Sequence, residues 1–240
     1  MNEARLERLL GLVQGRQFDP SLSVPVRICL ICPEALPVDG AGVSLIADGM
    51  HQPIAASDQL AQEIENMQVQ TGEGPCVDAY ASCLTIIEPD LRGAQAQLRW
   101  PAFSSGASEL GAGAVFGFPL VVNQVPIGAL DLYSRSATSL SDSELDDALM
   151  LADMAALSLR TSDGEDPLVV LNLGREPQQE WAHEAVVHHA AGMTAVQLGI
   201  SVDQAMLRLR AHAFVAGCSL ADTASDVVAR RLRIEAWTND

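Results

Sequence analysis

The sequence contains no lysine, so every permanent positive charge on its side chains comes from arginine. These 14 basic side chains are outnumbered by 31 acidic ones, and the net charge is −17. Because sequence-independent nucleic-acid binding draws its affinity from phosphate attraction, this composition argues against that class of function. The excess of acidic residues is uneven along the chain, since residues 1–175 carry 9 arginines against 23 acids and residues 176–240 carry 5 arginines against 8 acids. The C-terminal quarter is therefore the part that nucleic acid repels least.

The sequence also lacks a secretion signal and any apolar run long enough to span a bilayer. Its five cysteines are scattered and odd in number, which excludes a disulfide framework and predicts a reducing, cytoplasmic location. Cys29 and Cys32 have the spacing of a redox or zinc pair, but their flanks are those of an apolar helix. No second Cys or His pair lies at metal-ligand spacing. We therefore predict no metal site and no cofactor.

Residues 180–236 carry the pattern of three helices separated by two turns. Ser201 followed by Gln204 forms a capping box for the middle helix, and Gly199 and Gly217 are placed to end helices in the left-handed conformation. The three apolar stripes are Val186, Ala190, Met193 and Leu198; Val202, Ala205, Met206, Leu209, Ala213 and Ala216; and Leu220, Thr223, Ala224, Val227, Val228 and Leu232. Because so short a unit has a small core of its own, we predict that a second copy completes it.

This helical unit resembles the ANTAR domain, an RNA-binding antiterminator module. The residues that match its motif are Ala190, Gly192, Met193, Ala205, Leu209, Ala213, Leu220, Ala224 and Val227. One departure is His189, which stands where the family commonly has glutamine, and an imidazole replaces only one of the amide's hydrogen bonds. The resemblance implies a homodimer that binds hexanucleotide loops on tandem stem-loops of nascent leader RNA. Such loops expose bases that side chains can bond and stack on.

The candidate RNA contacts are polar residues outside the apolar stripes, namely His189, Arg208, Arg210, Ser219, Arg230 and Arg231. Arg208 and Arg210 diverge by about 200° around the helix, so both cannot face one partner. His189, Arg210 and Ser219 would converge if the turn before the third helix approached the first helix. The alternative for Arg210 is a structural residue that bridges helices. Arg230 and Arg231, at the end of the third helix, either contact RNA phosphates or only interact favourably with the helix dipole.

The first 160 residues mix helix and strand patterns. Helices are predicted over residues 1–17, 24–36, 58–69 and from Ser141 onward, and strands over 41–47, 51–56, 85–88, 114–122 and 126–133. Asp48-Gly49 is typical of a hairpin turn, and Ser141 with Glu144 forms a second capping box. The amphipathic helix 1–17 is predicted to be a dimer contact or a lid. This order predicts an α+β fold, with an antiparallel sheet and helices on one side.

Residues 24–160 resemble a GAF domain of the kind found ahead of ANTAR domains in actinobacterial regulators. The matching motifs are Gly72-Glu-Gly-Pro-Cys76, Asp90-Leu91, Trp100-Pro101, Phe118-Pro119-Leu120 and 127–133 (IGALDLY). The resemblance implies a sensory pocket beside the loop 71–76, with Gly72, Gly74 and Cys76 at a small ligand. The predicted organisation is thus an N-terminal helix (1–23), a GAF domain (24–160), a linker (161–179) and an ANTAR domain (180–236).

Two residues of the GAF region are open to more than one interpretation. Cys76 is either a thiol that senses oxidant or touches ligand, or a small buried hydrophobe. No arginine or histidine adjoins it in sequence to activate the thiol. His51 is either a haem or metal ligand, or a surface or hydrogen-bonded histidine, and the second interpretation is favoured because no partner lies at ligand spacing.

Catalytic motifs are missing as well, since the sequence has no nucleophile elbow, phosphate loop or metal-binding helix pair. We predict that the protein is no enzyme and has no membrane partner. The leading hypothesis is an antitermination regulator in which a GAF domain senses a signal and a dimeric ANTAR domain binds RNA. One alternative is a DNA-binding helical regulator, which Asp222 and Asp226 disfavour because phosphates repel them. The other is a sensory or protein-interaction module without nucleic acid, with which the net charge is compatible.

Overall fold

A computed structural model describes residues 3–15, 18–47, 50–159 and 179–234. In the range 179–234, the side chains are described from residue 186 onward. Residues 161–178 of the predicted linker (161–179) and the Asp48-Gly49 turn lie outside the described residues, and residue 179 already begins a helix. Within them, no helix is both long and apolar enough to cross a membrane.

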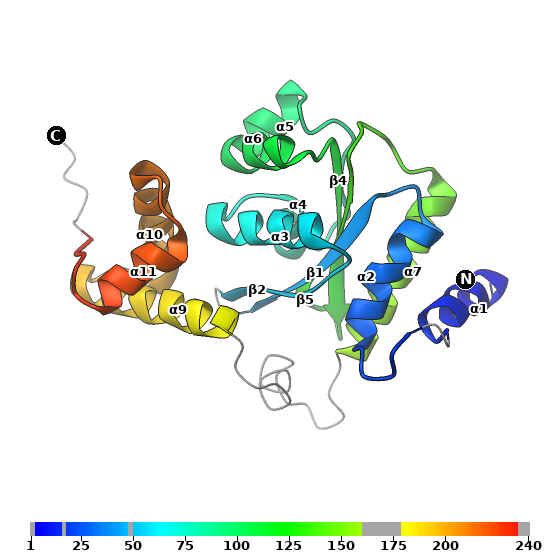
Figure 1. The fold of residues 1–240 in the computed structure, drawn as a ribbon, viewed down its shortest axis with the longest axis horizontal. Helices are drawn as coiled ribbons and strands as arrows, with labels where there is room; N and C mark the ends of the chain where they lie inside the picture. The colour runs from blue at the N-terminus through cyan, green and yellow to red at the C-terminus, as the bar shows by residue number, and fades with distance from the viewer. Residues whose placement is uncertain (1–2, 16–17, 48–49, 160–178, 235–240) are drawn as a thin grey trace.

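An antiparallel five-stranded sheet forms the centre of the N-terminal unit (Figure 1). Its strands are β1 Gly40–Ala47, β2 Met50–Ala56, β3 Ile86–Glu88, β4 Ala114–Val122 and β5 Val125–Ser134. Their order is β2-β1-β5-β4-β3, which places the first and last strands side by side in the middle. Asn123 and Gln124 both have positive φ, as a two-residue hairpin turn between β4 and β5 requires. The sequence therefore predicted each of the five strands.

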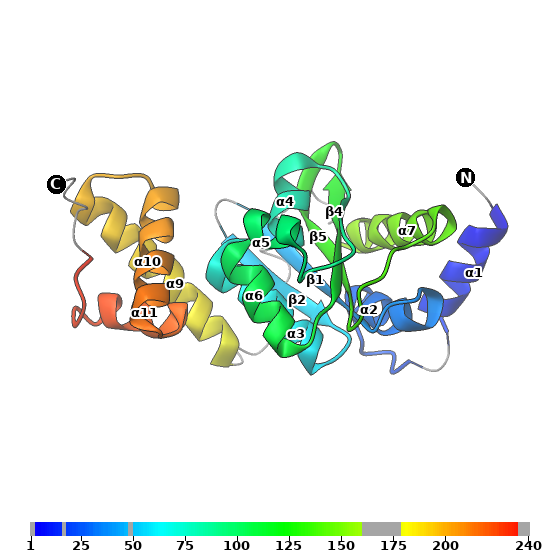
Figure 2. The same ribbon diagram turned by 90° about the horizontal axis from the view of Figure 1, so that it is seen from above.

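Helices cover both faces of this sheet, so the prediction of helices on one side is wrong (Figures 1 and 2). α2 (Val24–Ala35) and α7 (Asp142–Ser158) pack on one face. The helices α3 (Gln59–Thr71) and α4 (Pro75–Ser82) pack on the other, where α5 (Ala94–Arg99) and α6 (Pro101–Leu110) extend the layer. The physical reason is that β1 is buried along nearly its whole length. A strand without a polar face needs a covering layer on each side.

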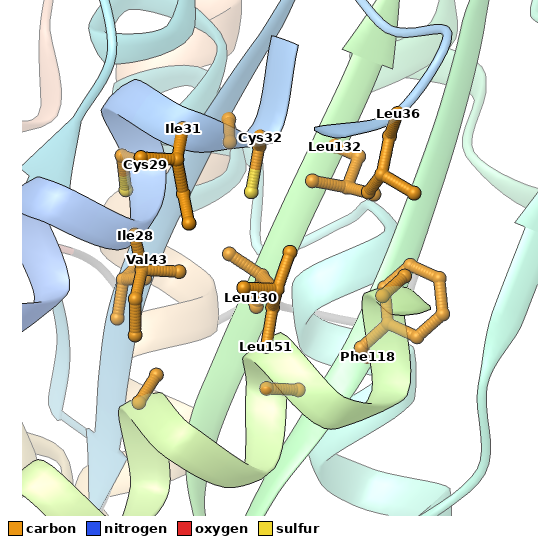
Figure 3. Packing of buried hydrophobic residues seen from close by; sticks show 14 of the residues in the cluster. Ile28, Cys29, Ile31, Cys32, Leu36, Val43, Phe118, Leu130, Leu132 and Leu151 are labelled. Carbon is orange, nitrogen blue, oxygen red and sulfur yellow. The ribbon is translucent and has the colours of Figure 1, made fainter. Parts of the chain in front are cut away.

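The core under α2 and α7 contains the cysteine pair (Figure 3). Cys29 and Cys32 are fully buried among aliphatic side chains, and burial raises the pKa of both thiols. The labelled neighbours are Ile28, Ile31, Leu36, Val43, Phe118, Leu130, Leu132 and Leu151. This apolar environment agrees with the interpretation that the pair packs in a helix rather than holds a metal.

The N-terminal helix α1 (Glu3–Val13) packs against α2 and α7 of the same chain. Leu9 and Val13 belong to the core under those helices. Arg5 and Arg8 both pair with Asp147 of α7. The apolar face that suggested a dimer contact or a lid is thus covered within the chain.

The C-terminal unit consists of α9 (Gln179–Leu198), α10 (Val202–Ala216) and α11 (Leu220–Val228). The Ser201–Gln204 capping box forms as predicted, and Gly199 and Gly217 are left-handed. Its core contains Ala190, Ala191, Met206, Leu209, Leu220, Ala224, Val227 and Ile234. Val202 and Ala216 are exposed, which corrects their place in the apolar stripe, because they lie at the two ends of α10.

Candidate functional site

A buried polar cluster lies between the sheet and the helices α3 and α4. β5 contributes Asp131, whose register partners in the two neighbouring strands are both glycines, Gly42 and Gly117. A Cβ on Gly42 would lie 2.6 Å from Glu65 Oε1, and one on Gly117 would lie 2.7 Å from the Pro75 carbonyl oxygen. The two glycines therefore leave room beside Asp131 for a carboxyl group from α3 and for the start of α4.

His51 reaches this cluster because β1 and β2 contain a bulge. The register shifts between Val43 and Ser44, so that Val43 faces Ala55 while Ile46 faces His51. Val43 and Ala55 pack in the core under α2 and α7, whereas Ile46 packs on the opposite face. A bulge inserts one residue and so switches which side chains share a face. It thereby places the His51 imidazole toward α3 and α4, where it is buried.

Glu65 and Gln68 lie one turn apart on α3 and both point into the cluster. The Ser44 hydroxyl donates to Glu65 Oε2, and Gln68 Nε2 donates to Asp131 Oδ2 over 3.0 Å. Gln68 Oε1 accepts from the backbone N–H of Cys76 at 2.8 Å. The other oxygen of Asp131, Oδ1, is buried without a hydrogen-bond partner among the described residues.

Cys76 lies in the first turn of α4, where Pro75 at the helix start and Gly74 with φ 129 fix the entry of the chain. Its sulfur lies 3.6 Å from His51 Nε2. Ligand atoms of His51, Glu65 and Cys76 all lie within 4.8 Å of one another, and the three side chains are buried. The fold thus brings together a thiol, an imidazole and a carboxyl that are far apart in sequence.

Burial governs the protonation of this cluster. Burial, and then the charge of Asp131, raises the pKa of Glu65 well above its usual range. Burial also raises the pKa of Asp131 to about 6, and that of the Cys76 thiol well above its ordinary value. Burial, followed by the positive charge of Arg210, lowers the pKa of His51 to about 3. Several acidic groups therefore share one dry space, which costs free energy unless protons or a cation neutralise them.

A small cavity adjoins Glu65 and Asp131 on the α3 side of the sheet. The space open to the centre of a water molecule is about 10 Å³, about what one water needs. Of the predicted ligand-binding residues, only Cys76 belongs to the polar cluster. Gly74 is packed against the Gln68 side chain, and Gly72 is packed against Arg210. The loop prediction over 71–76 is corrected at its end, because α4 already begins at Pro75.

Arg210 joins the C-terminal unit to the GAF-like unit. It lies on α10, which packs against α3, and its Nε donates to the Val69 carbonyl oxygen over 3.2 Å. This carbonyl is in the last turn of α3, where a cation interacts favourably with the helix dipole. The side chain is part-buried, and burial lowers its pKa. The predicted RNA contact therefore bridges two helices, but they belong to different units.

The other predicted RNA contacts are spread over the helical unit. His189, Arg230 and Arg231 are exposed, and Arg231 forms an ion pair with Asp226. Arg208 is half-buried, and Ser219 is engaged as the N-cap of α11, where it accepts from the N–H of Asp222. Of the adjacent pair His188 and His189, His188 is the one whose pKa is lowered, by burial and then by the charge of Arg210.

Four residues of the polar cluster were missed in the sequence: Ser44, Glu65, Gln68 and Asp131. One signal was available, because Asp131 interrupts an apolar strand between Leu130 and Leu132. An acidic residue that breaks a buried strand pattern indicates a site rather than a solvated surface.

The model of the GAF domain family matches residues 22–159. The comparison with curated proteins finds no match. Among solved structures, the GAF domain of an Acinetobacter phosphoenolpyruvate-protein phosphotransferase is 12% identical with a TM-score of 0.50, over 71% of this chain and 95% of that one. The corresponding domain from Coxiella burnetii is 19% identical with a TM-score of 0.49, over 65% and 90% of the two chains. A type II free methionine-R-sulfoxide reductase from Thermoplasma acidophilum is 17% identical with a TM-score of 0.42, over 55% and 87%. At 12% identity, the similarity to the Acinetobacter domain shows the fold alone.

Proposed function

Because this chain belongs to the GAF domain family, we propose that it is a signal-responsive regulator whose GAF domain controls a C-terminal RNA-binding unit of the ANTAR type. The GAF domain supplies the sensing part, which the polar cluster between sheet and helices supports. The ANTAR part is supported by three helices within the predicted range and by the burial of motif residues such as Ala190, Leu209 and Ala224. The output would be the stabilisation of an antiterminator stem-loop in nascent RNA.

The observation that carries this proposal is the hydrogen bond from Arg210 to Val69. It connects a candidate RNA contact directly to α3, the helix that also supplies Glu65 and Gln68 to the sensory cluster. A change at the cluster that moves α3 would alter this bond. RNA that recruits Arg210 has to displace it, so the GAF domain competes with RNA for one side chain. Two states that differ in one such contact are sufficient to couple two sites.

RNA affinity in this arrangement comes from a few well-placed contacts. Residues 176–240 carry 5 arginines against 8 acids, so long-range attraction to phosphate is weak. The exposed side chains of His189, Arg230 and Arg231 would supplement a released Arg210. A guanidinium offers five donors in a planar fork that can bond a base edge and stack on a base.

The helical unit also presents apolar side chains for a partner copy. Leu207 and Phe214 lie seven residues apart on α10, hence on one face, and remain 66% and 74% exposed. Exposed large apolar side chains grouped on one helix indicate an interaction surface. Arg210 lies between Leu207 and Phe214 on the same face, so a homodimer through α10 would place the two copies of Arg210 beside the interface, where tandem stem-loops could reach both.

Gel shifts of the full chain with a tandem hexaloop RNA and with duplex DNA, at two salt concentrations, test the proposal. We expect RNA to be bound in preference to DNA with a shallow salt dependence. Arg210→Ala should weaken RNA binding by about 1–3 kcal/mol, and Arg210→Lys should rescue it poorly. The matched control is Arg135→Ala, which removes an exposed arginine from the GAF domain. Preference for DNA would favour the DNA-binding alternative, and binding to neither would leave a sensory or protein-interaction module.

A further inference from the structure

We propose that His51, Glu65 and Cys76 form a binding site for a divalent transition metal ion, with Zn²⁺ as the ion that the ligand set fits. The site lies inside the GAF domain, between the sheet and the helices α3 and α4. This inference deepens the proposed function, because it gives the sensory domain a ligand. Metal binding itself does not depend on the RNA-binding part of that proposal.

The geometry of the thiol and imidazole is the first argument. In a tetrahedral zinc site the Zn–S bond is about 2.3 Å and the Zn–N bond about 2.0–2.1 Å, which separates the two ligand atoms by about 3.6 Å. Cys76 Sγ and His51 Nε2 are 3.6 Å apart. The Glu65 carboxylate completes a group whose ligand atoms all lie within 4.8 Å of one another. Three potential ligands from β2, α3 and α4 thus lie near enough to one another for a single ion to contact them.

Asp131 supplies the second, independent argument. The residue is only 4% exposed, and its Oδ1 is buried without a hydrogen-bond partner among the described residues. Buried carboxylate oxygens are nearly always bonded, so an unpartnered one needs an explanation. Asp131 faces the same cluster, because its other oxygen, Oδ2, accepts a hydrogen bond from Gln68. The side-chain oxygen of Gln68 in turn accepts from the backbone N–H of Cys76 at the start of α4. Asp131 lies outside the group of three side chains whose ligand atoms are all within 4.8 Å of one another, so it would stand beside a bound ion and contribute negative charge.

Charge and outer contacts agree with this assignment. Two carboxylates and a thiolate in a dry space repel one another, and a divalent cation removes most of that cost. Metal ligands are typically held by a second layer of hydrogen bonds. Ser44 donates to Glu65, and Gln68 donates to Asp131 while it accepts from the Cys76 N–H. Mixed sulfur, nitrogen and oxygen ligands suit zinc better than magnesium or calcium.

The chain contains a matched control in Cys29, which is as deeply buried as Cys76 but lies in the core on the other face of the sheet. Zn²⁺ content of the full chain should be measured after dialysis, for wild type, Cys76→Ser, His51→Gln and Cys29→Ser. We expect one Zn²⁺ per chain in wild type and in Cys29→Ser. Affinity should fall by about 100-fold or more in the two ligand variants, and by about 10–100-fold in Gln68→Ala. Loss of zinc in Cys29→Ser, or none bound by wild type, would overturn the assignment.

A second measurement needs no variant and so does not depend on whether Cys76→Ser folds. X-ray absorption of the zinc-loaded wild-type chain should report one sulfur ligand, with nitrogen and oxygen completing the coordination. Co²⁺ in place of Zn²⁺ should give a thiolate-to-cobalt charge-transfer absorption. Two sulfur ligands would instead place the ion at Cys29 and Cys32 and refute the site. Because no RNA is present, failure here leaves the RNA proposal standing, and failure of RNA binding leaves the metal site standing.

Discussion

Arg210 Nε lies 3.2 Å from the carbonyl oxygen of Val69, and this hydrogen bond ties the last turn of α3 to α10. The neighbouring Gly72 ends α3 with φ 68, and the guanidinium lies directly against it. A Cβ at this position would lie 2.6 Å from Arg210 Nη1. A side chain at residue 72 would thus displace the end of the Arg210 side chain from its present position.

The first prediction is that Gly72→Ala opens this junction and strengthens RNA binding. The added methyl group displaces the guanidinium, and the left-handed conformation costs about 1–2 kcal/mol in addition. Arg210 then becomes available to RNA. Gel shifts should show tighter binding than wild type, and the double variant with Arg210→Ala should lose that gain.

The control for this experiment is Gly217→Ala. Gly217 also has a positive φ of 63, but a Cβ added to it would meet no other atom within 4 Å. The backbone penalty is therefore similar while the junction stays intact. An equal gain in RNA binding from both variants would show that loss of stability, and not release of Arg210, is responsible.

The second prediction concerns the ionisation of His188 on α9. Burial, and then the charge of Arg210, lowers its pKa below the ordinary value of 6.5. Arg210→Ala removes the second cause, so the pKa of His188 should rise while burial still holds it below 6.5. An NMR titration of the imidazole measures this shift, and Arg208→Ala on the same helix is the control.

The sign of the stability effect follows from the same shift. A histidine whose pKa is lowered by folding contributes stability that is fully present above pH 6.5 and is lost as the pH falls through the folded value. The wild-type helical unit should therefore become less stable as the pH falls from about 7 to 5. Arg210→Ala should reduce this dependence. An unchanged titration of His188 in the variant would show that Arg210 does not lie near it in solution.

The elements that the sequence predicted best are those with local chemical signals. Both capping boxes, at Ser141 and Ser201, form as expected. Strand β4 has the predicted bounds of 114–122. These signals involve residues at most four apart, so they can be recognised without the tertiary fold.

The buried cluster could not be predicted in the same way because its members meet only through the fold. His51 and Cys76 are 25 residues apart, and a bulge between Val43 and Ser44 decides which face His51 occupies. Sequence spacing favoured a surface or hydrogen-bonded histidine, and a surface position is wrong because His51 is buried. It also identified no partner for Cys76. His51 and Cys76 are in fact neighbours in space, and this depends on the strand register, which the sequence spacing does not show.

The third prediction tests the independence of the two units through their helix caps. Ser201→Ala removes the side-chain acceptor for the N–H of Gln204 and should destabilise α10 by about 1 kcal/mol. Ser141→Ala removes the equivalent acceptor for Glu144 in α7 and should act on the GAF domain instead. Hydrogen exchange should show faster opening of residues 186–228 in the first variant and of 142–158 in the second. Equal effects on both segments would mean that the chain unfolds as one unit.

The final prediction is that the exposed face of α10 holds the proposed homodimer together. Leu207 and Phe214 are exposed on this face, and burying each against a partner copy is worth about 1.5–3 kcal/mol. Leu207→Ser combined with Phe214→Ser should therefore shift sedimentation from dimer to monomer at micromolar protein. The matched control is Leu98→Ser, which replaces a leucine that is 84% exposed on α5 of the GAF domain. Because all three side chains point to solvent, none of the variants should lower the melting temperature of the monomer. A wild-type chain that sediments as a monomer would refute the dimer. A double variant that remains dimeric would move the interface away from α10, and the tandem RNA arrangement would then need another surface.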